Sequence, residues 1–198
     1  MFGSPFEHFD TYERAAGLPV GSVRKVIARS SEHGAWAALE RGELTMPAFC
    51  TALDAEAAAE GIAIESVEIM ALIGQGIGAR PEMITAIGKI RELGLRTAAL
   101  TNNWPGGNGN GSPPGLRSLT VFDVVVESAV EGMRKPDPRI YELTCERLGV
   151  APTEAVFLDD IGANLKPARA MGMTTIKVDD PGQALRDLEA VLGFGLGD

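Results

Sequence analysis

Two adjacent carboxylates, Asp159 and Asp160, follow a short apolar run at residues 155–158 and precede Gly162 and Asn164. This pattern indicates a buried strand that leads into a helix. In an open α/β sheet, ligands bind beyond the carboxyl ends of the strands. Neighbouring carboxylates repel each other unless a cation lies between them, and Mg²⁺ prefers such oxygen ligands. The spacing therefore indicates a metal or phosphate site, with a helix N-cap as the alternative for either aspartate.

Polar side chains of complementary kinds follow other apolar segments. Thr101, Asn102 and Asn103 come directly after an apolar run, and Lys135 stands in a proline-bounded loop before a helical pattern. Hydroxyl, amide, ammonium and carboxylate groups together can position a phosphoryl group and neutralise its charge. Each of these residues has an ordinary structural explanation by itself. Their joint arrival at the edge of one sheet favours a phosphoryl site.

The first part of the chain has a purely helical pattern. Apolar residues recur at spacings of three and four over residues 20–30, 46–59 and 65–73, and no strand pattern interrupts them. We therefore expect a helical subdomain over roughly residues 8–77.

From about residue 78 onward, helical and strand patterns alternate. Such alternation predicts a parallel sheet with helices on both faces. The expected α/β core covers roughly residues 78–198, with strands near 96–101, 122–126, 155–159 and 174–178. A glycine- and proline-rich stretch at 105–115 predicts a loop.

The order of these motifs resembles that of the haloacid dehalogenase-like (HAD) hydrolases. Residues 100–103, 135–138 and 157–166 look like the second, third and fourth motifs of that family. More narrowly, the chain resembles the N-terminal phosphatase domain of soluble epoxide hydrolases and a related domain of an acyl-CoA dehydrogenase family member. The resemblance implies one HAD-like domain over residues 1–198, a Rossmann-like parallel sheet with a small helical cap.

The resemblance also implies a function and the residues that carry it. It implies a Mg²⁺-dependent phosphatase that acts on a small phosphorylated metabolite through an aspartyl-phosphate intermediate. Of the two aspartates, Asp160 is the expected direct metal ligand. Carried over motif by motif, the catalytic residues are Thr101, Asn102 and Lys135, the substrate-binding residues are Asn103 and Trp104, and the metal residues are Asp159, Asp160 and Asn164.

The family's nucleophilic aspartate, which ends the first core strand, has no match in this sequence. The opening segment Met1–Phe6 resembles the residues just after that motif, and Asp10, the first aspartate, lies in a helical pattern. We therefore expect a truncated version of a longer chain, with little or no turnover. Without its central strand the sheet should be poorly stable, or completed by residues 1–5 or a second chain.

Two other functions remain open for this set of residues. One is a non-catalytic HAD-like binding or interaction domain that kept the pocket and lost the chemistry. The other is a haloacid dehalogenase-type hydrolase. The pair Asp159–Asp160 favours the phosphatase, because dehalogenation by a carboxylate requires no cation. Whether the chain is itself an enzyme stays open.

Composition narrows the class of partner. The 198 residues carry a net charge of −9 with no basic cluster, which argues against nucleic acid and anionic membranes. The start lacks a signal-peptide pattern, and no apolar run is long enough to span a bilayer. Two distant cysteines are typical of a reducing compartment. We expect a cytoplasmic protein with a small-molecule partner, and the oligomeric state, self-association included, stays open.

Overall fold

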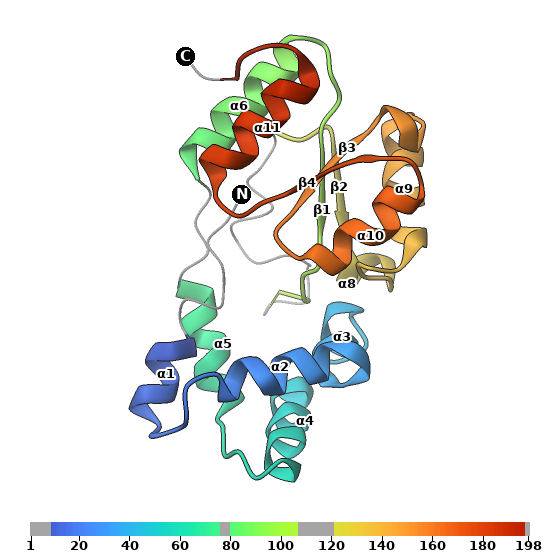
Figure 1. The fold of residues 1–198 in the computed structure, drawn as a ribbon. Coiled ribbons are helices and arrows are strands. Elements are labelled where there is room, and N and C mark those ends of the chain that lie inside the picture. The colour runs from blue at the N-terminus through green and yellow to red at the C-terminus, as the bar shows by residue number, and fades with distance from the viewer. Residues whose placement is uncertain (1–8, 76–79, 107–120, 197–198) are drawn as a thin grey trace. The chain divides into compact units, whose positions relative to one another are not determined.

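The computed structural model describes residues 9–75, 80–106 and 121–196. These residues form two compact units, shown in Figure 1: an α/β unit of residues 80–102 and 121–196, and a helical unit of residues 9–75 and 103–106. Along these three stretches, no helix is long and apolar enough to cross a bilayer.

The α/β unit contains four short parallel strands, and each expected strand is confirmed. They are β1 (Ala98–Thr101), β2 (Val124–Glu127), β3 (Val156–Asp159) and β4 (Thr174–Lys177). Strand β1 pairs with β2, and β3 pairs with β4. The described strands therefore form two two-stranded sheets, and no ladder joins β1 to β3. The sequence predicted the parallel direction of the strands. It also predicted a sheet without the family's central strand, and a break between two strand pairs agrees with that prediction.

Helices cover both faces of these strands, as expected for an α/β fold. Phe157 of β3 packs in a core with α9 (Pro138–Leu148) and α10 (Gly162–Ala170). Its neighbours Val156 and Leu158 pack in a second core with α6 (Pro81–Glu92) and α11 (Pro181–Leu192). This division follows from the alternation of side chains along a strand. The unit also contains α8 (Ser128–Glu131) and the 3₁₀ helix η2 (Pro152–Glu154).

Local capping signals fix the ends of α9 and α11. Each helix has proline at its first position and an aspartate before it, where the Asp137 and Asp180 side chains accept hydrogen bonds from the following turn. Helix α9 ends at Gly149, which adopts the left-handed conformation that glycine tolerates best.

The helical unit contains five helices among the described residues and no strand over residues 9–75, as expected. The helices are α1 (Phe9–Ala15), α2 (Ser22–His33), α3 (Ala35–Glu40), α4 (Met46–Ala59) and α5 (Ser66–Gln75). Their apolar faces meet in one core around Val23, Leu39, Phe49, Leu53 and Ile69. The unit buries its helices by amphipathic packing.

Residues 103–106 group with the helical unit, although they follow β1 of the α/β unit. The reason is packing, because Trp104 lies edge-on against Trp36 with ring centroids 6.2 Å apart. The sequence prediction had assigned this segment to the α/β core, because it used only position along the chain. Most of the expected glycine-rich loop, from residue 107 onward, lies outside the described residues.

A buried carboxylate of α1 caps the start of α2. Glu13 is fully buried, and its two carboxylate oxygens accept backbone N–H bonds from Gly21 and Val23, each at 2.7 Å. The first N–H groups of a helix have no partner within the helix, so this side chain satisfies donors that burial would otherwise leave unpaired.

Two carboxylates of α4 do the same for other helices. The N–H of Ala35, at the start of α3, donates to Glu56 Oε1 at 2.7 Å. Asp54 Oδ1 accepts the N–H of Ser66 at 2.8 Å and its hydroxyl at 2.6 Å, at the start of α5. Three acidic side chains, each from the side of one helix, thus bind the N-terminal end of another.

Glu13→Gln should lower the free energy of unfolding by about 1–3 kcal/mol, because an amide supplies one acceptor where two N–H donors need partners. The measurement is urea denaturation followed by circular dichroism. Glu32→Gln is the matched control, since Glu32 is an exposed glutamate of α2. Equal stability of the two variants would contradict the capping role of Glu13.

Candidate active site

A buried ion pair lies at the carboxyl end of β3. Lys135 Nζ is 2.6 Å from Asp159 Oδ2, and the two side chains are 11% and 4% exposed. Asp159 is the last residue of β3, and Lys135 lies in the loop between α8 and α9. A buried pair of charges is tolerated only where further hydrogen bonds satisfy the remaining donors and acceptors.

The second oxygen of Asp159 is occupied as well. Asp159 Oδ1 accepts the N–H of Ile161 at 2.8 Å and the side-chain amide of Asn164 at 3.0 Å. Both donors belong to the start of α10. Asp159 therefore binds donors at the beginning of that helix while it also holds Lys135, but the N-cap residue is Ile161, so neither aspartate is the N-cap that the alternative predicted.

Asn102 fixes the backbone of Lys135 from the end of β1. Its side-chain amide donates to the Lys135 carbonyl at 3.0 Å, and its side-chain oxygen accepts the Lys135 N–H at 2.8 Å. The hydroxyl of Thr101 donates to the carbonyl of Asn102 over a long 3.4 Å. Thr101 is half-buried, so its hydroxyl is engaged only weakly within the protein.

The two aspartates that the sequence singled out have different environments. Asp159 is buried, whereas Asp160 is exposed, and no hydrogen bond or ion pair joins its side chain to another described residue. Of the pair, Asp160 has the carboxylate that is available to bind an ion from solvent.

The structure brings together four of the eight predicted site residues: Asn102, Lys135, Asp159 and Asn164. We call these four residues the strand-end cluster. Thr101 and Asp160 are the sequence neighbours of Asn102 and Asp159. Asn103 is buried and Trp104 packs on Trp36, both within the helical unit. A substrate contact of these two residues stays a prediction.

Two aromatic residues near the cluster were not among the predicted site residues. Phe157 lies under Lys135, with Nζ 5.7 Å from the ring centroid, and Tyr141 packs edge-on against Phe157 at 5.3 Å. A cation near an aromatic face is attracted by the ring. The sequence marked both residues only as apolar positions of a strand and a helix.

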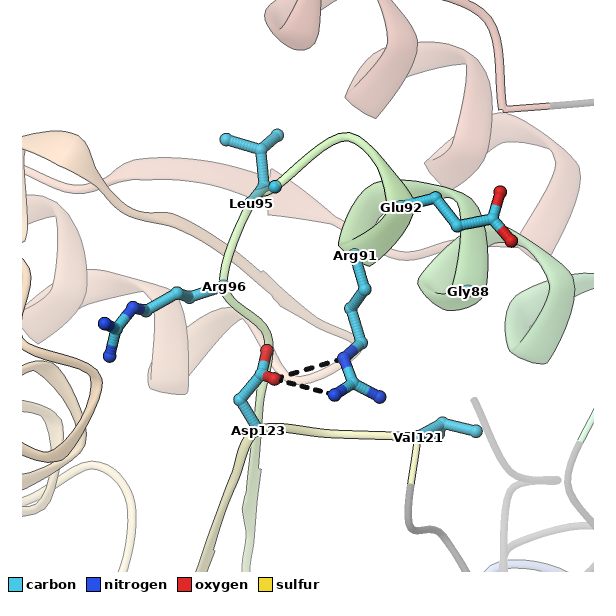
Figure 2. Close-up of a pocket in the computed structure, with 8 residues that line it drawn as sticks. Gly88, Arg91, Glu92, Leu95, Arg96, Val121 and Asp123 are labelled. Carbon is cyan, nitrogen blue, oxygen red and sulfur yellow. Dashed lines mark hydrogen bonds and ion pairs between the residues drawn. The ribbon is translucent and has the colours of Figure 1, made fainter.

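A cavity of about 530 Å³ lies at the opposite, amino end of β1 and β2 (Figure 2). Asp123 there pairs with Arg91 at 2.9 Å, and its pKa is lowered by the backbone N–H of Thr97 and by the arginine. Arg96 points away from this pair and donates to the Leu148 carbonyl. Because Arg91 and Arg96, the cations of its lining, already bind groups of the protein, this cavity is a poor candidate for the phosphoryl site.

Lys135→Met should lower the free energy of unfolding by about 3–5 kcal/mol, because it leaves the buried Asp159 charge without a cation. Adding Asp159→Asn to the same chain should recover part of that loss. The measurement is a double-mutant cycle by urea denaturation.

The matched control is Lys177→Met, which breaks the exposed pair of Lys177 and Asp179. Exposed pairs contribute about 1 kcal/mol or less. If Lys135→Met costs no more than this control, the buried pair does not stabilise the strand-end cluster.

Curated relatives share the sequence over most of its length. Acyl-CoA dehydrogenase family member 10 of Mus musculus is 42% identical over 90% of this chain and 17% of that protein. Bifunctional epoxide hydrolase 2 of Sus scrofa is 32% identical over 93% of this chain and 35% of that protein. Phosphatase MT3486 of Mycobacterium tuberculosis is 35% identical over 56% of this chain and 53% of that protein. The chain therefore spans little more than half, or less, of each relative.

Solved structures share the fold. A HAD family enzyme of Bacteroides thetaiotaomicron, in complex with magnesium and inorganic phosphate, matches with a TM-score of 0.54 at 19% identity, over 81% of this chain and 86% of that one. L-2-haloacid dehalogenase of Xanthobacter autotrophicus, with chloropropionic acid covalently bound, matches with a TM-score of 0.59 at 20% identity, over 100% of this chain and 81% of that one.

The sequence profile of haloacid dehalogenase-like hydrolases matches residues 9–172, which include the described helical unit, most of the α/β unit and all eight predicted site residues. The motif order, the parallel strands and this match agree, and the chain belongs to the haloacid dehalogenase-like hydrolase family.

Proposed function

We propose that this chain carries the phosphoryl-binding and metal-binding groups of a Mg²⁺-dependent phosphatase, which acts on a small phosphorylated metabolite through an aspartyl-phosphate intermediate. The observation that carries the proposal is the buried pair of Lys135 and Asp159, which Asn102 and Asn164 hold at the strand ends. The similarity to a mycobacterial phosphatase and to a fold that binds magnesium and phosphate supports it.

The proposed phosphoryl-binding groups are Thr101, Asn102 and Lys135. Lys135 has three N–H donors on Nζ, of which Asp159 accepts one, so the ammonium can also neutralise a phosphoryl oxygen. The weakly engaged hydroxyl of Thr101 is a further donor. Fixed donors of this kind stabilise charge during phosphoryl transfer without having to reorganise.

The site fits Mg²⁺ through one direct ligand, Asp160, which is the sequence neighbour of Asp159 in the strand-end cluster. Within the described ranges no three His, Cys, Asp or Glu residues form a metal-binding group. Mg²⁺ does not require such a cage, because it is commonly bound by one or two carboxylates, substrate phosphate and water. In this proposal Asp159 and Asn164 support the site, and the bound metal would neutralise phosphoryl charge.

Neither Asp159 nor Asp10 is arranged as an attacking nucleophile, and Asp160 is the proposed metal ligand. Asp159 has both oxygens engaged, and Asp10 forms an ion pair with Arg24 within the helical unit at 3.5 Å. We therefore propose that residues 1–198 bind a phosphoryl group without rapid turnover. The same observation favours the second candidate function, a non-catalytic binding domain.

A dehalogenase gains support from the fold of the Xanthobacter enzyme, but it leaves the exposed carboxylate of Asp160 without a role. The helical unit is proposed as the cap that selects the substrate, with Asn103 and Trp104 as its contributions. A cytoplasmic location and a small-molecule partner complete the proposal.

Asp160→Asn should abolish the Mg²⁺-dependent part of inorganic phosphate binding, because the substitution removes the charge that the metal needs. The measurement is isothermal titration calorimetry of phosphate into protein with and without Mg²⁺. Asp187→Asn is the control, since Asp187 is an exposed aspartate of α11. Phosphate binding that ignores both Mg²⁺ and Asp160→Asn would refute the proposed metal site.

Purified protein of residues 1–198 should release little or no phosphate from a broad panel of phosphate monoesters, because both oxygens of Asp159 are engaged within the protein and Asp160 is assigned to the metal. The measurement is phosphate release with and without Mg²⁺. Strong release that Asp160→Asn abolishes would show that another carboxylate is the nucleophile, with Asp10 the first to substitute. If the protein shows neither phosphate release nor Mg²⁺-dependent phosphate binding while a partner binds, the non-catalytic binding domain is the better assignment.

A further inference from the structure

Tyr141 of α9 is fully buried, yet its hydroxyl points at the strand-end cluster. The hydroxyl donates to the backbone carbonyl of Asn164 at 2.7 Å. The side chain of Asn164 in turn donates to Asp159 Oδ1 at 3.0 Å. One hydroxyl therefore fixes the residue that orients the central carboxylate.

The ring of Tyr141 is linked to the other member of the ion pair, Lys135, through Phe157. It packs edge-on against Phe157 at 5.3 Å, and Phe157 lies under the ammonium of Lys135 at 5.7 Å. Tyr141 thus contacts both neighbours through which the positions of Asp159 and Lys135 are set. No other described side chain of α9 donates a hydrogen bond to α10.

We infer that Tyr141 is a positioning residue of the strand-end cluster, which acts through Asn164 on Asp159 and through Phe157 on Lys135. The inference rests on the proposed function for its consequence, phosphate and metal binding. A hydroxyl donor is required for it, since a phenylalanine ring could fill the same space without holding the Asn164 carbonyl.

The electrostatic environment keeps that donor intact. Burial raises the pKa of Tyr141, and the negative charge of Asp159 raises it further. The phenol consequently stays protonated through the physiological range, so its hydrogen bond does not switch with pH.

The test compares two hydroxyl deletions on one helix. Tyr141→Phe removes the hydroxyl that donates to Asn164, whereas Thr144→Val removes a buried hydroxyl that donates to the Ile140 carbonyl, also at 2.7 Å. Both deletions cost one buried hydrogen bond, so general destabilisation should be similar. We expect Tyr141→Phe to weaken Mg²⁺-dependent phosphate binding about tenfold, as loss of a supporting hydrogen bond around a metal site does. Thr144→Val should leave it within about twofold.

Nuclear magnetic resonance reads the same contact without any ligand. We expect the side-chain amide resonances of Asn164 to shift in Tyr141→Phe and to stay in place in Thr144→Val. The chain has two tyrosines, Tyr12 and Tyr141, so protein labelled with ¹³C at the phenol carbon gives an internal control. On adding phosphate with Mg²⁺ to the unsubstituted chain, the Tyr141 resonance should move and that of Tyr12, in the helical unit, should not.

Equal effects of the two deletions on binding, or an unchanged Asn164 amide in Tyr141→Phe, would overturn the inference. If Tyr141→Phe fails to fold, the labelled unsubstituted chain decides: an Asn164 amide that moves on ligand addition while Tyr141 stays still also overturns it. Absence of all ligand response refutes the proposed function instead, and the ligand-free Asn164 amide then tests Tyr141 separately.

Discussion

The α/β unit depends on the burial of one ion pair, Lys135 with Asp159. Taking two charges out of water costs several kcal/mol per ion. The attraction between the two ions offsets this cost only where the geometry is good and further hydrogen bonds satisfy the remaining donors and acceptors. The structure supplies those bonds from Asn102, Ile161 and Asn164. The α/β unit therefore needs all of these residues, although they are far apart in the sequence. If one of them is lost, a buried charge is left without a hydrogen-bond partner.

The helical unit uses the same physical principle without any cation. Glu13, Asp54 and Glu56 each accept backbone N–H bonds at the start of another helix. The positive end of a helix dipole favours a carboxylate there. In a chain with a net charge of −9, acidic side chains thus act as internal ligands for the backbone in both units.

Elements with a local signal could be predicted from the sequence. Strands β1, β2 and β3 lie on short apolar runs, and β4 lies on the β-branched segment 174–176. Helices α9 and α11 begin with Asp-Pro, which can be recognised without tertiary information. The motif order also gave Asn102, Lys135, Asp159 and Asn164, which the structure brings together.

Features that depend on tertiary contacts had no such signal. The carboxylate of Glu13 is 8 and 10 residues from the N–H groups it accepts, and Tyr141 is 23 residues from Asn164. In the sequence these residues are an ordinary helical glutamate and an apolar helix position. The grouping of Trp104 with the helical unit likewise follows from its contact with Trp36, which no periodicity encodes. The break between the two strand pairs also lies beyond what apolar runs can predict.

The two hydrogen bonds between Asn102 and the backbone of Lys135 have a consequence for the joint between the strand pairs. They connect the end of β1 to Lys135 and, through the ion pair, to β3, although no ladder connects these strands among the described residues. The groups that are proposed to bind a phosphoryl group therefore also hold the two sheets together. Substitution of Asn102, Lys135 or Asp159 would loosen that joint, whereas the exposed Asp160 can be exchanged without disturbing it.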